Sequence, residues 1–186
     1  MALREDTTAN LLGALGVAVF DHIRDSVDAA GGHGGQGGAA LTTIGMLPGL
    51  SVGHLAGVLG LTHPGTVRLV ERLVAEDLVE KTPSAEDGRA LALKLTPLGR
   101  QRRRDILSQR NRRLQAMLET LTASERRQFD GLLRRILGDL PVPTRQQAYQ
   151  VCRYCDAGPC FRNDCPVDEA CPEAAADGLA AMTARR

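Results

Sequence analysis

The sequence predicts a mainly α-helical protein with one small β-hairpin. Three observations carry this prediction: long stretches with apolar residues at helical spacing, a central pair of short capped helices, and a following segment in which apolar residues alternate. With 186 residues, 43% of them hydrophobic, the chain is long and apolar enough for one domain with an appendage. Aromatic residues make up 3%, so leucine, valine, alanine and isoleucine must fill the core.

Two helices are predicted in the N-terminal region, residues 1–50. Residues 8–30 form the first, with one apolar stripe that consists of Leu11, Leu12, Leu15, Val19, His22 and Ile23. The glycine-rich stretch 31–38 predicts a flexible linker. A short helix over about 39–47 follows, ended by Pro48-Gly49.

The next segment predicts two short helices joined by a tight turn, which is a helix-turn-helix. Ser51 is placed to cap the first helix and Gly60 to end it. Thr62 is placed to cap the second helix, with Pro64 in its first turn. The buried stripe of this second helix is predicted at Val67, Val70, Leu73 and Val74.

Two strands are predicted after the helix-turn-helix. They run from Leu78 to Thr82 and from Ala90 to Leu95, and the second has the alternation of a half-buried strand. A polar, turn-rich connection lies between them. A helix-turn-helix followed by a hairpin is a winged helix.

Two longer helices are predicted next. Thr96-Pro97 begins one that runs to about Leu121, and a capping box from Thr122 to Glu125 begins another that Gly138 ends. Their apolar residues are Ile106, Leu107, Leu114, Met117, Leu118, Leu121, Phe129, Leu132, Leu133, Ile136 and Leu137. Because a small winged helix cannot cover these faces together with that of the first helix, we expect them to be buried in a homodimer.

The order of these elements and the local sequence resemble the MarR (multiple-antibiotic-resistance regulator) family. The matching stretches are LAGVLGLTHPGTVRLVERLVAEDLVEK, the hairpin segment Asp87-Gly-Arg89, and Leu95-Thr-Pro-Leu-Gly99. The resemblance covers residues ~8–138. It implies an intertwined helical homodimer with dimerisation helices in residues 1–50 and 96–140 and a winged helix-turn-helix in residues 51–95. It further implies a repressor that binds a palindromic double-stranded DNA operator and is released by a small-molecule effector or an oxidant.

The charge distribution agrees with a DNA-binding middle. The chain has a net charge of +1, but basic residues outnumber acidic ones over residues 51–138. The predicted DNA-contacting residues are His63, Gly65, Thr66, Arg68, Arg72, Lys81, Asp87 and Arg89.

Each of these residues has an expected role. His63, Thr66 and Arg68 are expected to reach base edges and phosphates in the major groove, and Arg72 and Lys81 to contact phosphates. The resemblance implies that Arg89 enters the minor groove while Asp87 orients it. The alternative for Arg68 and Arg72 is that they are solvated helix residues paired with Glu71 or Glu76.

The sequence predicts that residues 141–186 form a separate cysteine-rich tail. All five cysteines lie between Cys152 and Cys171. The spacing favours a tetrahedral zinc site with Cys152, Cys155, Cys160 and Cys165 as ligands. Three alternatives stay open: an iron–sulfur cluster, indicated by Cys165-Pro166, metal-free thiols that switch through disulfides, and inert cysteines.

These patterns favour a DNA-binding transcription regulator, modulated by metal, redox state or a small ligand. The alternative is a redox or metal-handling protein that uses the winged helix as a scaffold. The sequence has no glycine-rich phosphate loop, nucleophile elbow or catalytic metal motif, so we do not expect an enzyme. It has no apolar run of ~18 residues and begins with a polar, acidic segment, so we expect a cytoplasmic protein without a membrane partner.

Overall fold

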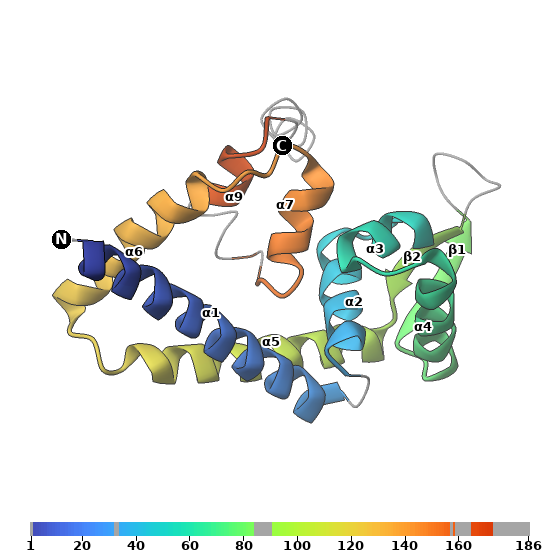
Figure 1. Ribbon diagram of the computed structural model, residues 1–186. Coiled ribbons are helices and arrows are strands. Elements are labelled where there is room, and N and C mark those ends of the chain that lie inside the picture. Colours follow the sequence, from blue (N-terminus) through green and yellow to red (C-terminus); the bar gives the residue numbers. More distant parts are fainter. Residues whose placement is uncertain (1, 32–33, 84–90, 157, 159–164, 173–186) are drawn as a thin grey trace, which may run out of the picture.

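The computed structural model confirms the predicted fold class: a mainly helical chain with one two-stranded antiparallel sheet (Figure 1). The structure describes residues 2–31, 34–83, 91–156, 158 and 165–172. The elements are α1 (Ala2–Gly31), α2 (Gly34–Met46), α3 (Val52–Leu59), α4 (His63–Ala75), β1 (Val79–Pro83), β2 (Leu91–Leu95), α5 (Pro97–Leu118), α6 (Ala123–Gly138), α7 (Arg145–Cys152) and α9 (Pro166–Glu169). Within these ranges, no helix combines the length and apolar character needed to cross a bilayer.

The main core lies in the winged helix, where α2, α3 and α4 close over the hairpin. Leu55, Leu69, Leu73 and Leu93 are buried there, and Ile106 of α5 joins the same cluster. Fully burying one such side chain stabilises the folded state by about 1.5–3 kcal/mol. These residues therefore hold the helix-turn-helix on the hairpin within a single chain.

Side-chain caps define the two helices of the helix-turn-helix, as the sequence predicts. Ser51 Oγ accepts the backbone N–H of His54 at 3.2 Å, and Thr62 Oγ1 accepts that of Gly65 at 3.3 Å. Gly60 ends α3 with a φ of 65°, a left-handed conformation that favours glycine. The turn is therefore encoded locally.

The hairpin is joined to the segment that precedes α3. The N–H of Gly49 donates to the carbonyl of Leu93 at 2.9 Å, and the N–H of Leu93 donates to that of Leu50 at 3.0 Å. The predicted alternation holds for Leu93 and Leu95, which are buried, and is wrong for Leu91, which is 51% exposed. Leu91 pairs with the last residue of β1, at the far end of the hairpin from the core.

The beginning of α5 is fixed against the end of α4. Thr96 Oγ1 accepts the N–H of Gly99 at 3.0 Å and donates to the carbonyl of Asp77 at 2.5 Å. A Cβ at Gly99 would lie 1.9 Å from the carbonyl oxygen of Leu78, so only glycine fits there. The predicted start of this helix is confirmed, whereas its end falls at Leu118, before the expected position.

The predictions for the N-terminal helices are only partly correct. The first helix begins at Ala2 rather than at residue 8, and residues 34–38 of the expected linker 31–38 are helical because α2 begins at Gly34. Packing overrides the low helix propensity of glycine here. A Cβ at Gly38 would lie 1.9 Å from Cγ1 of Val27, so the missing side chain allows α1 and α2 to approach closely.

A second, smaller core joins α7 and α9 to the end of α6. Its buried members are Val142, Ala148, Val167 and Cys171, with Leu137 and Leu140 packed against them. Thr144 caps α7, the helix that leads to the cysteines, by accepting the N–H of Gln147 at 3.3 Å. This core holds both ends of the cysteine-containing segment.

The prediction of a separate cysteine-rich unit is wrong for the described part of the tail, because this part packs on the main body. Gln150 Nε2 of α7 donates to the carbonyl of Gly57 in α3 at 2.8 Å. The hydroxyl of Tyr154 donates to the carbonyl of Gly35 at 2.9 Å, and its ring meets Phe20 edge-on with centroids 6.5 Å apart. These long-range contacts have no periodic signature in the sequence.

Candidate nucleic-acid interface

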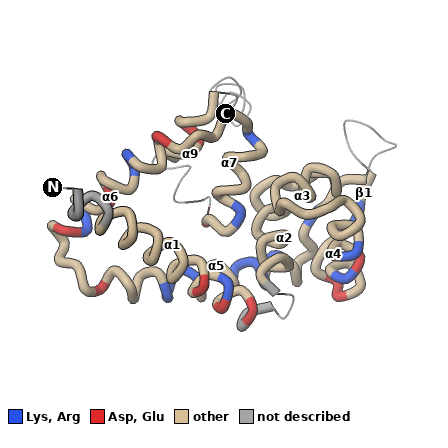
Figure 2. Tube along the Cα trace, in the orientation of Figure 1, with Lys and Arg blue, Asp and Glu red and all other residues tan. Residues whose placement is uncertain are grey.

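The outer face of α4 carries four of the eight predicted DNA-contacting residues, namely His63, Gly65, Arg68 and Arg72. His63, Arg68 and Arg72 are exposed, and Arg68 and Arg72 line a shallow groove together with Gly65, Glu71 and Ala75. The positions of the charged residues of α4 lie close together along the trace, at the end of the molecule formed by the winged helix (Figure 2). An exposed helix with cations on its free face and a capped N-terminus has the form required to enter a major groove.

The structure corrects the orientation predicted for α4. Thr66, expected to reach DNA, is fully buried, and its hydroxyl donates to the carbonyl of Thr62 at 3.1 Å. Val74, expected in the buried stripe, is 38% exposed, whereas Leu69 is buried. The buried stripe of α4 is therefore rotated towards Thr66 and Leu69.

The predicted contacts in the hairpin divide into two groups. Lys81 is exposed on β1, where it pairs across the sheet with Leu93 and can reach a phosphate. Asp87 and Arg89 lie in residues 84–90, outside the described residues. Their roles in the minor groove stay predictions.

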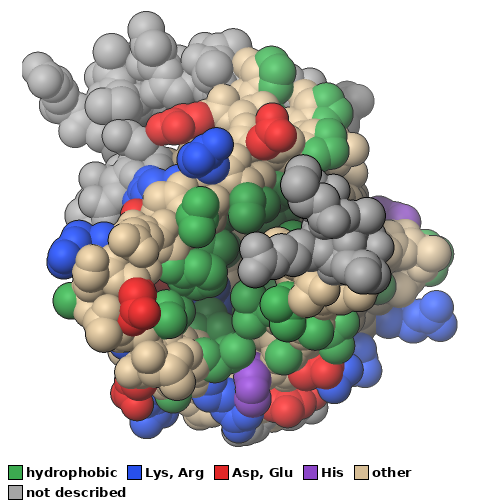
Figure 3. Space-filling model, turned by 60° about the vertical axis from the view of Figure 1, so that its left-hand side comes forward, with side chains coloured by type: hydrophobic (Ala, Val, Ile, Leu, Met, Phe, Trp, Pro, Cys, Tyr) green, Lys and Arg blue, Asp and Glu red, His purple; other side chains and the backbone are tan. Residues whose placement is uncertain are grey.

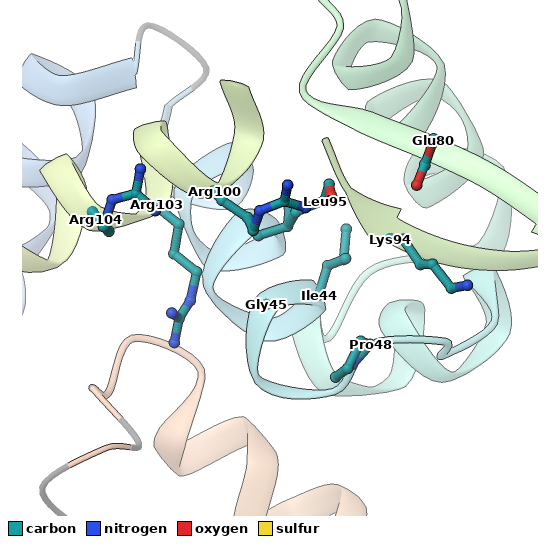
Figure 4. A pocket seen from close by; sticks show the side chains of 9 residues that line it. All are labelled: Ile44, Gly45, Pro48, Glu80, Lys94, Leu95, Arg100, Arg103 and Arg104. Carbon is teal, nitrogen blue, oxygen red and sulfur yellow. Dashed lines mark hydrogen bonds between the residues drawn. The ribbon is translucent and has the colours of Figure 1, made fainter. Parts of the chain in front are cut away.

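A basic cavity that the sequence does not predict lies beside the hairpin. It has a volume of about 460 Å³ and lies between α2, the hairpin and the first turns of α5 (Figure 4). Its lining residues are Ile44, Gly45, Pro48, Glu80, Lys94, Leu95, Arg100, Arg103 and Arg104. The cluster of arginines that begins α5 was its only sequence signal, and the same composition is typical of a solvated helix face.

Two of these arginines are held in place by the fold. Arg100 donates from Nη1 to the carbonyl of Leu95 at 2.8 Å. Arg103 runs past Gly45, where a Cβ would lie 2.3 Å from its Cδ, and points towards the turn after α7 (Figure 4). Burial lowers the pKa of Arg103, while the carboxylate of Asp156 acts in the opposite direction. The cavity wall is therefore in electrostatic contact with the cysteine-containing segment.

The helices outside the winged helix leave apolar side chains exposed. On the face that Figure 3 turns forward, such side chains gather around a hollow. The exposed apolar residues of α1 and α6 include Leu11, Leu12, Val17, Phe20, Leu132, Leu133 and Ile136. No residue of α6 within the described part of the chain is buried, although its apolar stripe follows the predicted spacing.

The described cysteines meet where α7 ends and α9 begins. Cys152 and Cys165 pack against the apolar cluster in which Cys171 is fully buried. Cys160 lies outside the described residues. Among the residues that the structure describes, no group of three or more histidine, cysteine, aspartate or glutamate side chains is arranged to hold a metal ion. The zinc site at Cys152, Cys155, Cys160 and Cys165 therefore stays a prediction.

The thiol contacts give these cysteines different pKa values. The pKa of Cys165 is lowered to about 6, because the sulfur accepts a hydrogen bond from Cys152 and from the backbone N–H groups of Asp168 and Val167. The pKa of Cys155 is lowered to about 7, chiefly by its hydrogen bond from Cys152 and also by the charge of Arg110. The pKa of Cys152 is raised, because its proton is shared with both neighbours.

Comparison with known proteins identifies the winged helix. Residues 38–90 match the model of the MarR family. This segment belongs to the MarR family. It begins in α2, contains the whole helix-turn-helix and β1, and extends to the residue before β2. Members of the MarR family are transcription regulators rather than enzymes, and residues 38–90 carry the domain of that family. No match was found among curated protein sequences.

Solved structures share the fold over more of the chain. The transcriptional regulator Tm0710 from Thermotoga maritima is 21% identical with a TM-score of 0.59, covering 72% of this chain and 93% of that one. A MepR mutant from Staphylococcus aureus, bound to an oligodeoxyribonucleotide, is 19% identical with a TM-score of 0.54, covering 70% and 95%. The Mycobacterium tuberculosis MarR family protein Rv2887, in complex with p-aminosalicylic acid, is 25% identical with a TM-score of 0.52, covering 67% and 97%.

Proposed function

We propose that this chain is a homodimeric transcriptional repressor that binds a palindromic operator through the MarR-family domain. The observation that carries the proposal is the exposed face of α4, where His63, Arg68 and Arg72 are free to meet DNA while the opposite face is buried in the core. The MepR structure with bound oligodeoxyribonucleotide has the same fold. In this proposal α4 enters the major groove, and Lys81 contacts the backbone.

The exposed apolar faces of α1 and α6 support the proposed dimerisation. A folded chain in water rarely leaves a contiguous row of large apolar side chains uncovered. A second copy presents the same faces, and a two-fold axis between the copies would cover both sets. Two α4 helices related by that axis would then read two half-sites of a palindrome.

Fluorescence anisotropy with the DNA upstream of the chain's own gene tests the proposal. We expect tight binding at low salt that weakens steeply as salt rises, since phosphate contacts release counterions. Arg68→Ala should weaken specific binding by about 1–3 kcal/mol, the usual size of a good base contact. Arg127→Ala, which removes an exposed arginine of α6, is the matched control and should change the affinity less than twofold.

Repression is tested separately in cells. A reporter gene placed behind the upstream region of the gene that encodes this chain should be expressed more strongly when that gene is deleted. Unchanged or lower expression would contradict the assignment as a repressor without affecting DNA binding.

We further infer that the basic cavity takes a small anionic effector. Lys94, Arg100 and Arg104 line it, and its volume of about 460 Å³ suits a small aromatic acid. The related Rv2887 structure contains p-aminosalicylic acid. We expect this compound to bind by calorimetry and to weaken DNA binding, and Arg104→Ala to reduce its affinity several-fold. Equal affinity of the unmodified chain and Arg104→Ala for p-aminosalicylic acid would contradict this assignment.

A further inference from the structure

The helix α7 lies between the winged helix and the segment that ends α6 (Figure 1). On one side, Ala148 of α7 is buried in the second core, to which Leu137 and Leu140 also belong. On the other side, Gln150 Nε2 donates to the carbonyl of Gly57 in α3 at 2.8 Å. A single helix of eight residues therefore contacts both the outer helices and the helix-turn-helix.

The contact between α7 and α3 is centred on a glycine. Gln146 and Gln150 are four residues apart, so they lie on the same face of α7. A Cβ at Gly57 would lie 2.5 Å from Oε1 of Gln146, so the missing side chain allows α7 to approach α3 closely. At Gly53, one turn earlier on α3, a Cβ would meet only Oγ of Ser51, at 3.8 Å. The close approach therefore occurs at Gly57 and not at Gly53.

The turn that follows α7 is attached at a further place. The hydroxyl of Tyr154 donates to the carbonyl of Gly35 in α2, and its ring meets that of Phe20 in α1 edge-on. The guanidinium group of Arg153 lies over the same ring, 5.3 Å from its centroid, where a cation is attracted to the aromatic face. Because α7 is attached at α3 and at α2, neither contact alone can act as a pivot.

These contacts add to the covalent connection between the winged helix and the outer helices. That connection runs through the beginning of α5, where Gly99 packs on the carbonyl of Leu78. An attachment at α3 lies on a different helix, and two attachments at separate points restrict rotations that one would allow. Leu55 of α3 and Leu69 of α4 share one core, so a restraint on α3 also restrains α4.

We propose that α7 fixes each winged helix relative to α6 and thereby restricts the distance between the two half-sites that the dimer accepts. Gln146 and Gln150 are positioning residues in this proposal, because they act through α3 and not on DNA. The inference rests on the proposed function for the dimer and its operator, whereas the restraint is a property of one chain. One base pair added between the half-sites separates them by about 3.4 Å more and turns them by about 35°, so two fixed α4 helices cannot contact both.

The test measures how affinity depends on the distance between half-sites. Footprinting of the full chain on its upstream duplex locates the half-sites, and fluorescence anisotropy then compares that duplex with versions in which one base pair is added or removed between them. We expect the unmodified chain to lose at least tenfold in affinity on either altered duplex. The double variant Gln146→Ala/Gln150→Ala should lose less than threefold. General destabilisation lowers the active fraction equally for every duplex, so it leaves this ratio unchanged.

Val151→Ala is the matched control, because it shortens an exposed side chain of α7 next to Gln150. It should keep the tenfold loss. An unmodified chain that accepts the altered duplexes with less than a threefold loss would overturn the proposal. A double variant that keeps the full tenfold loss would overturn it as well.

A second pair of variants opens the same contact from α3. Gly57→Leu places a side chain where Gln146 lies, and leucine has a higher helix propensity than glycine, so α3 should still form. Gly57→Leu should behave like the double variant of α7. Gly53→Leu adds the same side chain one turn earlier, where there is room, and should keep the tenfold loss. Equal ratios for the two leucine variants would contradict a role for the contact at Gly57.

Hydrogen exchange of the chain without DNA separates this proposal from the proposed function. We expect the amides of α7 to be protected in the unmodified chain and to exchange at least tenfold faster in the double variant, with β2 unchanged. Exchange of α7 at the rate of an unfolded peptide in the unmodified chain would overturn the restraint. An unmodified chain without affinity for the upstream duplex would instead contradict the proposed function, and the exchange rates would still decide whether α7 is held.

Discussion

The winged helix and the outer helices differ in how far their apolar side chains are buried within one chain. The winged helix buries its large apolar residues within one chain, and Leu55, Leu73 and Leu93 have no exposed surface. On α1 and α6 the apolar stripes are equally regular but remain open, with Leu11 at 65% and Ile136 at 48% exposure. The same hydrophobic periodicity therefore specifies an internal core in one region and a surface that needs a partner in the other.

The largest effect is expected in the core of the winged helix. Leu93→Ala should lower the free energy of unfolding by about 2–5 kcal/mol, because it leaves a cavity among buried residues. Leu91→Ala is the matched control, two positions away on the same strand and half exposed. It should cost less than about 0.5 kcal/mol in urea denaturation at fixed protein concentration. Equal losses for both variants would contradict the assigned burial of β2.

Substitutions in the outer helices should weaken the association of two chains rather than the folding of one. Ile136→Glu should weaken the dimer at least tenfold, because burying an isoleucine side chain contributes about 1.5–3 kcal/mol and a two-fold interface contains it twice. Leu98→Glu changes an equally exposed residue at the beginning of α5 and should leave the dimer intact. Sedimentation equilibrium measures both constants. A dimer that tolerates Ile136→Glu would exclude the stripe on α6 from the interface.

A smaller effect is expected at the cap of α4. Thr62→Ala removes the acceptor of the Gly65 N–H group and should lower the free energy of unfolding by about 1 kcal/mol. Thr120→Ala is the control, because its hydroxyl makes only a 3.4 Å contact with the carbonyl of Met117. Chemical denaturation compares the two variants. If Thr62→Ala matched the control in stability, the contribution assigned to this cap would be wrong.

The smallest effect is a pH dependence at the beginning of α6. The hydrogen bonds from the side chain and then the backbone of Thr122 lower the pKa of Glu125 below its ordinary value of 4.5. A carboxyl whose pKa is lower in the folded state stabilises the fold above the unfolded pKa, and this contribution is lost as pH falls through the folded pKa. The melting temperature of the unmodified chain should exceed that of Glu125→Gln at pH 7, and the difference should shrink as the pH is lowered below 4.5 through the folded pKa. A constant difference across this range would contradict the assigned shift.

The local features of the fold could be predicted from the sequence because they depend on neighbouring residues. The caps at Ser51, Thr62 and Thr96 and the left-handed Gly60 are confirmed. Features that depend on distant contacts could not be predicted in this way. The helical state of Gly38 depends on Val27 of α1, and the burial of Thr66 depends on how α4 is rotated against the core.

The candidate site shows the same division. Exposure of His63, Arg68 and Arg72 follows from the helix-turn-helix pattern, and these predictions agree with the position of α4. The basic cavity and the contact of Gln150 with Gly57 join segments far apart in the chain. Neither the periodicity nor the spacing of residues predicts such contacts, because they depend on how whole helices pack against one another.

The claim that a two-fold pair of winged helices binds duplex DNA is tested most directly by sedimentation velocity of the chain with a labelled upstream duplex. We expect one complex that contains two chains per duplex, formed at low ionic strength and dissociated as salt is raised. A single chain that sediments alone and leaves the duplex free at low ionic strength would contradict it.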